Sequence, residues 1–272
     1  MDLVDTHCHI HEADESFDGE TETRIRWKRE GDLTPDAMLK SAKKVGVTKV
    51  ICVGTTVEDS VLATDFVKER SGCWASIGIH PHEADKYLND PKKLKEFKAL
   101  ANKPKVVAVG ECGLDYFYTH SPKTDQIKML RLQIELALQH DLPIIFHVRD
   151  AFDDFWPIFD SYKNVRGVIH SFSSDKKNLY EILQRNLFIG LNGIMTFTKN
   201  ADQLEAARAA PLDRIVVETD APFLTPTPYR GTICEPRHVR VTTEFLADLR
   251  GESLDAFASA TTVNALNLFK LL

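Results

Sequence analysis

Short apolar runs that alternate with helix-length stretches are the feature that most limits what this chain of 272 residues can fold into. Near-continuous apolar runs such as Pro143–Phe146 are typical of parallel strands that are buried on both faces. The predicted strands are Leu3–Thr6, Val50–Gly54, Trp74–Gly78, Val106–Gly110, Pro143–Phe146, Gly167–Ile169, Leu187–Gly190 and Arg214–Val217. Eight strands, each followed by a helix, predict an α/β protein with a (β/α)8 TIM barrel, and a doubly wound open sheet is the main alternative.

The domain organisation follows from what the chain lacks. No internal repeat, low-complexity tract or linker divides it, so we predict a single domain over residues 1–272. A charged loop insertion at residues 12–32 follows the first strand, either as a solvated loop or as a lid over the substrate. The clearest helical spacing joins Ile127, Leu130, Ile134 and Leu138, and a C-terminal helix over Leu254–Leu271 is expected to pack outside the barrel.

Charge and cysteine usage narrow the function classes. A net charge of −6 is opposite in sign to that of proteins that hold nucleic acid mainly by counterion release, so a stable DNA-binding module is disfavoured. This net charge is compatible with an enzyme that binds the end of a nucleic acid strand through a few local contacts. The five scattered cysteines argue against a disulfide framework, and neither a signal peptide nor a membrane-length apolar run is visible, so we expect a cytoplasmic protein without membrane partners.

Two histidines stand at the end of the first predicted strand. Because residues i and i+2 share a face of a strand, Asp5, His7 and His9 are expected to project together. Two imidazoles that converge in this way can grip one metal ion, and Asp5 could orient them from behind. A lone His-x-His pair is weak evidence for a metal site unless further ligands stand elsewhere in the chain.

The same arrangement recurs at later strand ends. Metal-type ligands stand where the apolar runs stop, namely Glu111, His147, His170 and Asp220. In a parallel barrel all these ends lie at one face, where active sites are built. Four histidines and two carboxylates form a mixed nitrogen and oxygen set that suits divalent ions such as Zn, Mn or Mg. Taken singly, each of these residues could instead be a structural histidine or an acidic helix cap.

Motifs along almost the whole chain resemble those of the TatD-type metal-dependent deoxyribonucleases, which belong to the amidohydrolase-like barrels. The motifs are Asp5 with His7-Cys8-His9, Gly78-Ile79-His80-Pro81-His82, Gly110-Glu111-Cys112-Gly113-Leu114-Asp115-Tyr116, Phe146-His147-Val148-Arg149, His170-Ser171-Phe172-Ser173, Glu218-Thr219-Asp220-Ala221-Pro222 and Thr262-Val263-Asn264-Ala265. Two departures stand out. The stretch Glu12–Asp32 is longer than the family usually has, and Cys234 stands where the family usually has Asn.

The resemblance implies two divalent ions per subunit, Mg, Mn or Zn. His7, His9 and Asp220 would hold the first, His147 and His170 the second, and Glu111 would bridge both. It further implies hydrolysis of phosphodiester bonds in DNA, as an exonuclease on single-stranded ends, with a metal-activated water as nucleophile. Asp220 and Glu111 are the expected catalytic residues, with Asp220 orienting the water and accepting its proton. By strand periodicity, Glu218 shares a face with Asp220 and is a candidate supporting residue.

Four residues are candidate substrate contacts. Arg149 shares a face with His147 and could clamp a phosphate, unless it pairs with Asp150 or Asp153. The candidates for contact or stacking with a base of single-stranded DNA are His80, His82 and Tyr116.

Three other function classes compete with the nuclease: a different hydrolase, a metal-binding partner protein and a plain α/β domain without metal. The same ligands could hydrolyse an ester or amide, including D-aminoacyl-tRNA deacylation, because an activated water also attacks a carbonyl. A metal-binding partner protein without catalysis would show a broken ligand set, whereas all six ligands are present here. No obligate protein partner is evident from the sequence.

Overall fold

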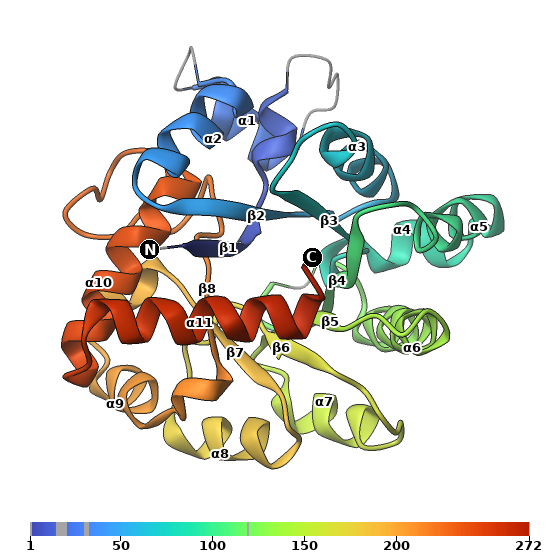
Figure 1. The fold of residues 1–272 in the computed structure, drawn as a ribbon. Coiled ribbons are helices and arrows are strands. Elements are labelled where there is room, and N and C mark those ends of the chain that lie inside the picture. The colour runs from blue at the N-terminus through green and yellow to red at the C-terminus, as the bar shows by residue number, and fades with distance from the viewer. Residues whose placement is uncertain (1, 15–20, 30–32, 119, 272) are drawn as a thin grey trace. The chain divides into compact units, whose positions relative to one another are not determined.

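The computed structural model describes residues 2–14, 21–29, 33–118 and 120–271. Its eight strands are neighbours in chain order within one sheet, from β1 to β8, which confirms the predicted (β/α)8 barrel class (Figure 1). The strands are β1 Leu3–Cys8, β2 Val47–Val53, β3 Cys73–Ile77, β4 Val106–Asp115, β5 Ile144–Arg149, β6 Gly167–Ile169, β7 Phe188–Leu191 and β8 Ile215–Val217. The helices are α1 Glu22–Lys28, α2 Pro35–Lys44, α3 Val57–Val67, α4 Ala84–Leu88, α5 Pro91–Leu100, α6 Lys123–Gln139, α7 Phe152–Phe159, α8 Lys176–Gln184, α9 Ala201–Ala209, α10 Val239–Arg250 and α11 Leu254–Phe269.

Contacts within the chain divide it into two compact units. Unit 1 comprises Met1–Cys52 and Ser171–Leu272, and unit 2 comprises Val53–His170. The sequence-based expectation of a single domain stays a prediction. No helix in the described ranges is both long and apolar enough to cross a membrane. All five cysteines lie in the described ranges and are buried, and none of them forms a disulfide, as their scattered positions indicated.

Unit 1 contains the C-terminal helix, which packs against β1 and β8 as expected (Figure 1). Two buried phenylalanines, Phe257 and Phe269, place an apolar face of α11 in the core. The side-chain amide of Asn264 donates to the carbonyls of Leu212 and Ile215, each at 2.8 Å, so it satisfies backbone acceptors beside β8. This explains why a polar residue lies on the buried face of the helix.

Unit 2 contains β3 to β6, and its longest strand differs from the prediction. β4 continues to Asp115, five residues beyond the predicted end at Gly110, because it stays paired with β5. The register pairs Gly113 with His147 and Asp115 with Arg149. Glu111 therefore lies within a strand rather than after it.

Helix α6 covers β4 in unit 2 and matches the predicted helix in part. Leu130 and Ile134 are buried as the spacing indicated, but Leu138 is 37% exposed. The buried face includes two polar residues, Gln126 and Gln133, whose partners lie beside the candidate site. Hydrophobic periodicity alone could not identify them.

Helix α1 occupies part of the segment 12–32, for which the sequence predicted a charged loop or a lid. The Thr21 hydroxyl caps this helix by accepting a bond from the Arg24 N–H at 2.9 Å. Arg24 is buried with its guanidinium bonded to the carbonyls of Glu12 and Asp14, at 2.7 and 2.6 Å. Trp27 is also buried, so a charged stretch hides two anchoring side chains. Residues 15–20 and 30–32 of the segment lie outside the described residues.

Candidate metal centre

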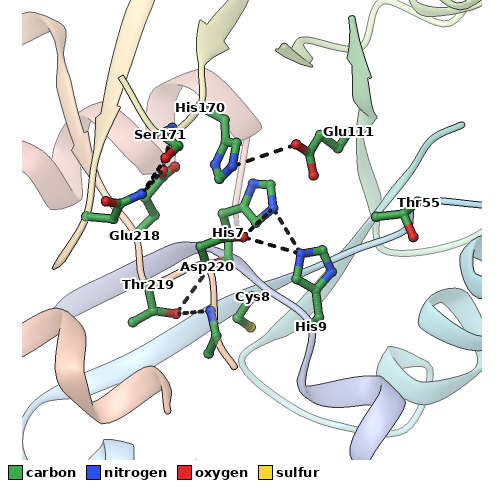
Figure 2. A network of polar contacts seen from close by, with 12 residues as sticks. His7, Cys8, His9, Thr55, Glu111, His170, Ser171, Glu218, Thr219 and Asp220 are labelled. Carbon is green, nitrogen blue, oxygen red and sulfur yellow. Dashed lines mark hydrogen bonds and ion pairs between the residues drawn. The ribbon is translucent and has the colours of Figure 1, made fainter. Parts of the chain in front are cut away.

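Unit 1 brings together three predicted ligands, His7 from β1, His9 just after β1 and Asp220 after β8. The Nε2 atoms of the two histidines lie 3.3 Å apart, and each lies 3.5 Å from Oδ1 of Asp220 (Figure 2). Asp220 has a left-handed backbone (φ 61°), which Asp adopts more readily than most residues. Its N–H donates to the His7 carbonyl at 2.8 Å, and the His9 N–H donates to the Ala221 carbonyl at 2.8 Å, so backbone bonds fix the cluster.

The spacing of these three atoms fits a divalent ion. They form a nearly equilateral triangle, so one point in its plane lies about 2.0 Å from all three. Zinc binds histidine nitrogen and carboxylate oxygen at roughly 2.0–2.2 Å. Two imidazoles and a carboxylate also suit other divalent ions. The donor set and its geometry therefore can hold a metal ion within unit 1.

Asp5 supports this cluster through the backbone rather than through the imidazoles. Its carboxylate accepts bonds from the Thr219 N–H and hydroxyl, at 2.9 and 2.6 Å, and from the His7 N–H at 3.3 Å. Burial raises the pKa of Asp5 to about 8, although the bonds from Thr219 act in the opposite direction. The sequence placed Asp5 behind the histidine rings, and the structure places it between the chain segments that carry two ligands.

Glu218 is buried directly after β8 and holds a different segment. It accepts a bond from the Ser171 N–H at 2.7 Å and from the Asn192 side-chain amide at 3.3 Å. A Cβ atom at Gly190 would lie 2.3 Å from its carboxylate, so glycine at that position makes room for it. Because Ser171 directly follows His170 in the chain, Glu218 fixes the backbone next to another predicted ligand.

Unit 2 gathers histidines around one carboxylate oxygen, Oε1 of Glu111. This oxygen lies 2.7 Å from Nδ1 of His147 and 3.7 Å from Nε2 of His170. Figure 2 shows the His170 imidazole directed toward Glu111. The Nε2 atom of His80 lies equally near, at 3.6 Å. The sequence identified His80 only as a substrate contact, and the structure adds it to a potential metal-binding group with Glu111 and His147.

Asp115 is a buried residue of this region. It belongs to one of the sequence motifs, but the sequence indicated no role for it. Its Oδ2 atom lies 3.0 Å from Nε2 of His147 and 2.9 Å from Nε2 of His82. Its Oδ1 atom accepts bonds from the backbone N–H groups of Phe117 and Tyr118, at 3.0 and 2.9 Å. One carboxylate thus orients an imidazole of the cluster and fixes the loop that follows β4.

The pKa values of two histidines in unit 2 depend on burial and on the carboxylates of Glu111 and Asp115. Burial lowers the pKa of His147, but the bonds to Asp115 and Glu111 outweigh it and raise this pKa to about 9. Burial raises the pKa of Asp115, and the bonds from His147 and His82 hold it well below its usual range. Burial and the neighbouring His147 lower the pKa of His80. Buried negative charge of this kind favours a cation at the cluster.

Two other predicted substrate contacts have partners that the sequence did not indicate. The Tyr116 hydroxyl donates to Asp154 at 2.8 Å, and the ammonium of Lys123 lies 3.8 Å from the centre of the Tyr116 ring. Arg149 is exposed, and within the described residues no carboxylate lies within ion-pairing distance of it, Asp150 and Asp153 included. Its guanidinium contacts aromatic rings instead.

Two glutamines of α6 hold the loops of the site in unit 2. Gln126 bonds both the N–H and the carbonyl of Asp115, at 2.8 and 3.1 Å. Gln133 makes the same pair of bonds with Ile79, next to His80, at 2.8 and 2.9 Å. The only sequence signal for them is an amide residue on the buried face of a predicted helix.

Comparison with known proteins agrees with the geometry. A family model described as TatD related DNase matches residues 4–270. The uncharacterized metal-dependent hydrolase YcfH of Escherichia coli K12 is 36% identical over 275 residues, which cover 100% of this chain and 97% of that protein. A protein of Erwinia billingiae named 3′-5′ ssDNA/RNA exonuclease TatD is 33% identical over 244 residues, covering 87% and 93%. The crystal structure of YjjV, a TatD homologue from Escherichia coli K12, superimposes with a TM-score of 0.86 at 27% identity, covering 99% and 98%.

The family model spans nearly the whole chain, and it includes all the motifs and ligand-type residues described above. This chain belongs to the TatD-related DNase family and is a metal-dependent hydrolase.

Proposed function

We propose that this protein hydrolyses phosphodiester bonds in DNA, as an exonuclease on single-stranded ends, with two divalent ions per subunit. The observation that carries the proposal is the triangle of His7, His9 and Asp220, whose spacing suits a divalent ion. The family match and the exonuclease name of the relative from Erwinia billingiae support a nucleic acid substrate. The buried cysteines of this chain form no disulfide, which agrees with our further proposal that the protein works in the cytoplasm.

The ligand assignment follows the two clusters. We assign one ion to His7, His9 and Asp220, and the second to His147 and His170, with Glu111 as the carboxylate that binds both. Divalent ions in such a site lower the pKa of a bound water and offset charge on phosphoryl oxygens. Mg, Mn and Zn are all compatible with imidazole and carboxylate donors.

In this mechanism the side chains orient the reactants and move the proton. Asp220 directs the attacking water with its carboxylate and accepts the proton that the water loses. The carboxylate of Asp5 keeps the backbone of Thr219 next to Asp220 in place. Asp115 holds the His147 ring from behind, so that this ligand keeps one orientation during turnover.

Cleavage of an end-labelled single-stranded oligonucleotide tests the proposal. We expect shortening of the strand with Mn²⁺ or Mg²⁺, no activity with excess chelator, and at least a hundredfold lower rate for Asp220→Asn. Asp213→Asn is the matched control, because Asp213 is an exposed aspartate just before β8, whereas Asp220 follows β8. Cleavage that continues in chelator, or an Asp220→Asn variant with the wild-type rate, contradicts the proposal.

A substrate panel separates this function from ester or amide hydrolysis. The same preparation is given the oligonucleotide, a carboxylic ester and a D-aminoacyl-tRNA. We expect turnover of the phosphodiester alone. Turnover of the ester or the D-aminoacyl bond without cleavage of the oligonucleotide assigns the protein to the other class of hydrolase.

Glu111→Gln tests the bridging role. The variant keeps the size of the side chain and removes its charge. A carboxylate that binds both ions predicts that the variant loses affinity for both, measured as bound Mn²⁺ per chain by titration. Loss of one ion alone, with the other bound at wild-type affinity, shows that Glu111 binds only one.

A further inference from the structure

Exposed aromatic side chains and one arginine form a patch on unit 2 that the proposed mechanism does not use. Phe117 and Tyr118 are 56% and 43% exposed, and their ring centres lie 4.8 Å apart. The guanidinium carbon of Arg149 lies 4.2 Å from the centre of the Phe117 ring and 4.8 Å from that of Tyr118. We call these three residues the aromatic platform. Contiguous exposed aromatic surface, unlike a single exposed apolar residue, is a candidate binding site.

The charge of the platform is uncompensated. As noted above, no carboxylate within the described part of the chain lies within ion-pairing distance of Arg149. A guanidinium that rests on aromatic rings keeps its N–H donors available at its edge. The Tyr118 ring also stacks on His120, with the ring centres 5.8 Å apart. The exposed parts of the Phe117 and Tyr118 rings thus lie beside guanidinium donors for an anion.

The position of the platform is fixed relative to the histidine cluster of unit 2. Asp115 accepts bonds from the N–H groups of Phe117 and Tyr118 with one oxygen, and its other oxygen contacts the His147 imidazole. Arg149 stands two residues after His147 on β5, about 7 Å further along the strand. The rings and the guanidinium are therefore held at a constant distance from a candidate metal ligand.

A nucleotide has the complementary chemistry, a flat base for the rings and a phosphate for the guanidinium. We propose that the aromatic platform is a subsite for one nucleotide of a single-stranded substrate, with the base against Phe117 and Tyr118 and a backbone phosphate at Arg149. This inference rests on the proposed function, since it names how that substrate is held. The subsite accepts any base, because every base has a face that can stack.

The subsite also explains how an acidic chain can bind a nucleic acid strand. With a net charge of −6 the chain has little general attraction for nucleic acid, so strand binding must come from local contacts. One stacked base and one phosphate contact next to the cluster supply such a local contact.

Binding of oligonucleotides with and without one base tests the subsite. Fluorescence anisotropy in the presence of Ca²⁺ measures the affinity of the protein for a labelled single strand. The same measurement is made with strands in which one abasic residue replaces one of the three terminal nucleotides at either end. We expect wild-type protein to bind one abasic version roughly five- to hundredfold more weakly. Phe117→Leu and Tyr118→Leu should bind the intact strand more weakly and lose most of this difference between strands. Tyr180→Leu is the matched control, because Tyr180 is a 62% exposed tyrosine in unit 1.

Arg149 has its own readout in the salt dependence of binding. Loss of one phosphate contact reduces the slope of log affinity against log salt by about 0.7 for a single strand. Arg149→Gln should show this reduction, whereas Arg149→Lys should keep the slope. An unchanged slope in Arg149→Gln overturns the phosphate contact.

The outcomes for the subsite and for the proposed function are distinguishable. If wild-type protein binds the strand but removal of a base weakens binding equally in wild-type, Phe117→Leu and Tyr118→Leu proteins, the subsite is refuted and the nuclease proposal stands. If the base dependence is found but no phosphodiester is cleaved, the subsite stands and the nuclease proposal fails. If wild-type protein binds none of the strands, both are refuted.

Discussion

Gly113 allows β4 and β5 to approach closely where β5 carries His147, and alanine at this position gives a measurable perturbation. A Cβ atom at Gly113 would lie 1.8 Å from the carbonyl oxygen of His147, whereas real Cβ contacts are not shorter than 3.0 Å. The two strands must therefore separate by about 1.2 Å at this register pair, and backbone atoms cannot rotate away as a side chain does.

Such a displacement affects both stability and the site. Overpacking of this kind costs about 1–3 kcal/mol of unfolding free energy, which lowers Tm by roughly 2–10 °C in a protein of this size. The His147 contacts with Glu111 and Asp115, at 2.7 and 3.0 Å, cannot both survive a shift of this size. A displacement of about 1 Å at a catalytic group commonly costs about a hundredfold in rate.

The assay combines thermal unfolding, Mn²⁺ titration and oligonucleotide cleavage on Gly113→Ala. We expect a lower Tm, loss of one bound ion and a rate at least a hundredfold lower. Gly251→Ala is the control, because Gly251 has a left-handed backbone (φ 68°) with open space around it. It should lose about 1 kcal/mol of stability and keep metal binding and rate. Wild-type Tm and metal content in Gly113→Ala would refute the reasoning.

Three further predictions concern unit 1. Burial and Arg237 lower the pKa of His238 to about 4, so the unfolded chain takes up a proton at a higher pH than the folded chain does. The free energy of unfolding should therefore fall by up to about 3 kcal/mol from pH 6.5 to pH 4. Chemical denaturation across this range should show a weaker decline in His238→Gln. Thr219→Val removes the 2.6 Å bond to buried Asp5 and should cost about 1–3 kcal/mol by thermal unfolding, whereas Thr219→Ser should not. Trp27→Phe removes the hydrogen bond from the indole N–H to the His9 carbonyl at 3.1 Å, so titration should show several-fold weaker binding of one Mn²⁺ ion. Trp74→Phe in unit 2 is the control and should leave Mn²⁺ binding unchanged.

The fold could be predicted because apolar runs and helical spacing repeat along the chain. The strand ends were less predictable. The sequence from Glu111 to Asp115 reads as a loop after an apolar run, since it contains two acids and a glycine. It continues as a strand because Gly113 lets it pair closely with β5, which is a tertiary effect.

The sequence indicated the candidate ligands and two supporting residues, Asp5 and Glu218, but no role for Asp115, Gln126 or Gln133. His7, His9 and Asp220 meet within unit 1, and Glu111, His147 and His170 meet within unit 2. The two glutamines carry no pattern of their own. Gln126 and Gln133 resemble ordinary polar positions of a helix, and their roles depend on backbone groups of distant segments.

Helix α1 shows the same limit for surface segments. A run of acidic and basic residues favours a solvated loop, and charge patterning gave no reason to bury Arg24 or Trp27. Both are buried because backbone carbonyls near the end of β1 accept their bonds. The segment is thereby attached to the His9 backbone, a link that depends on tertiary structure alone.

The most direct test of the account is the anomalous scattering of crystals grown with Mn²⁺. We expect two peaks per chain, one bound by His7, His9 and Asp220 and one bound by His147 and His170, with Glu111 as a ligand of both. Saturating Mn²⁺ with no peak at His7, His9 and Asp220 would contradict it.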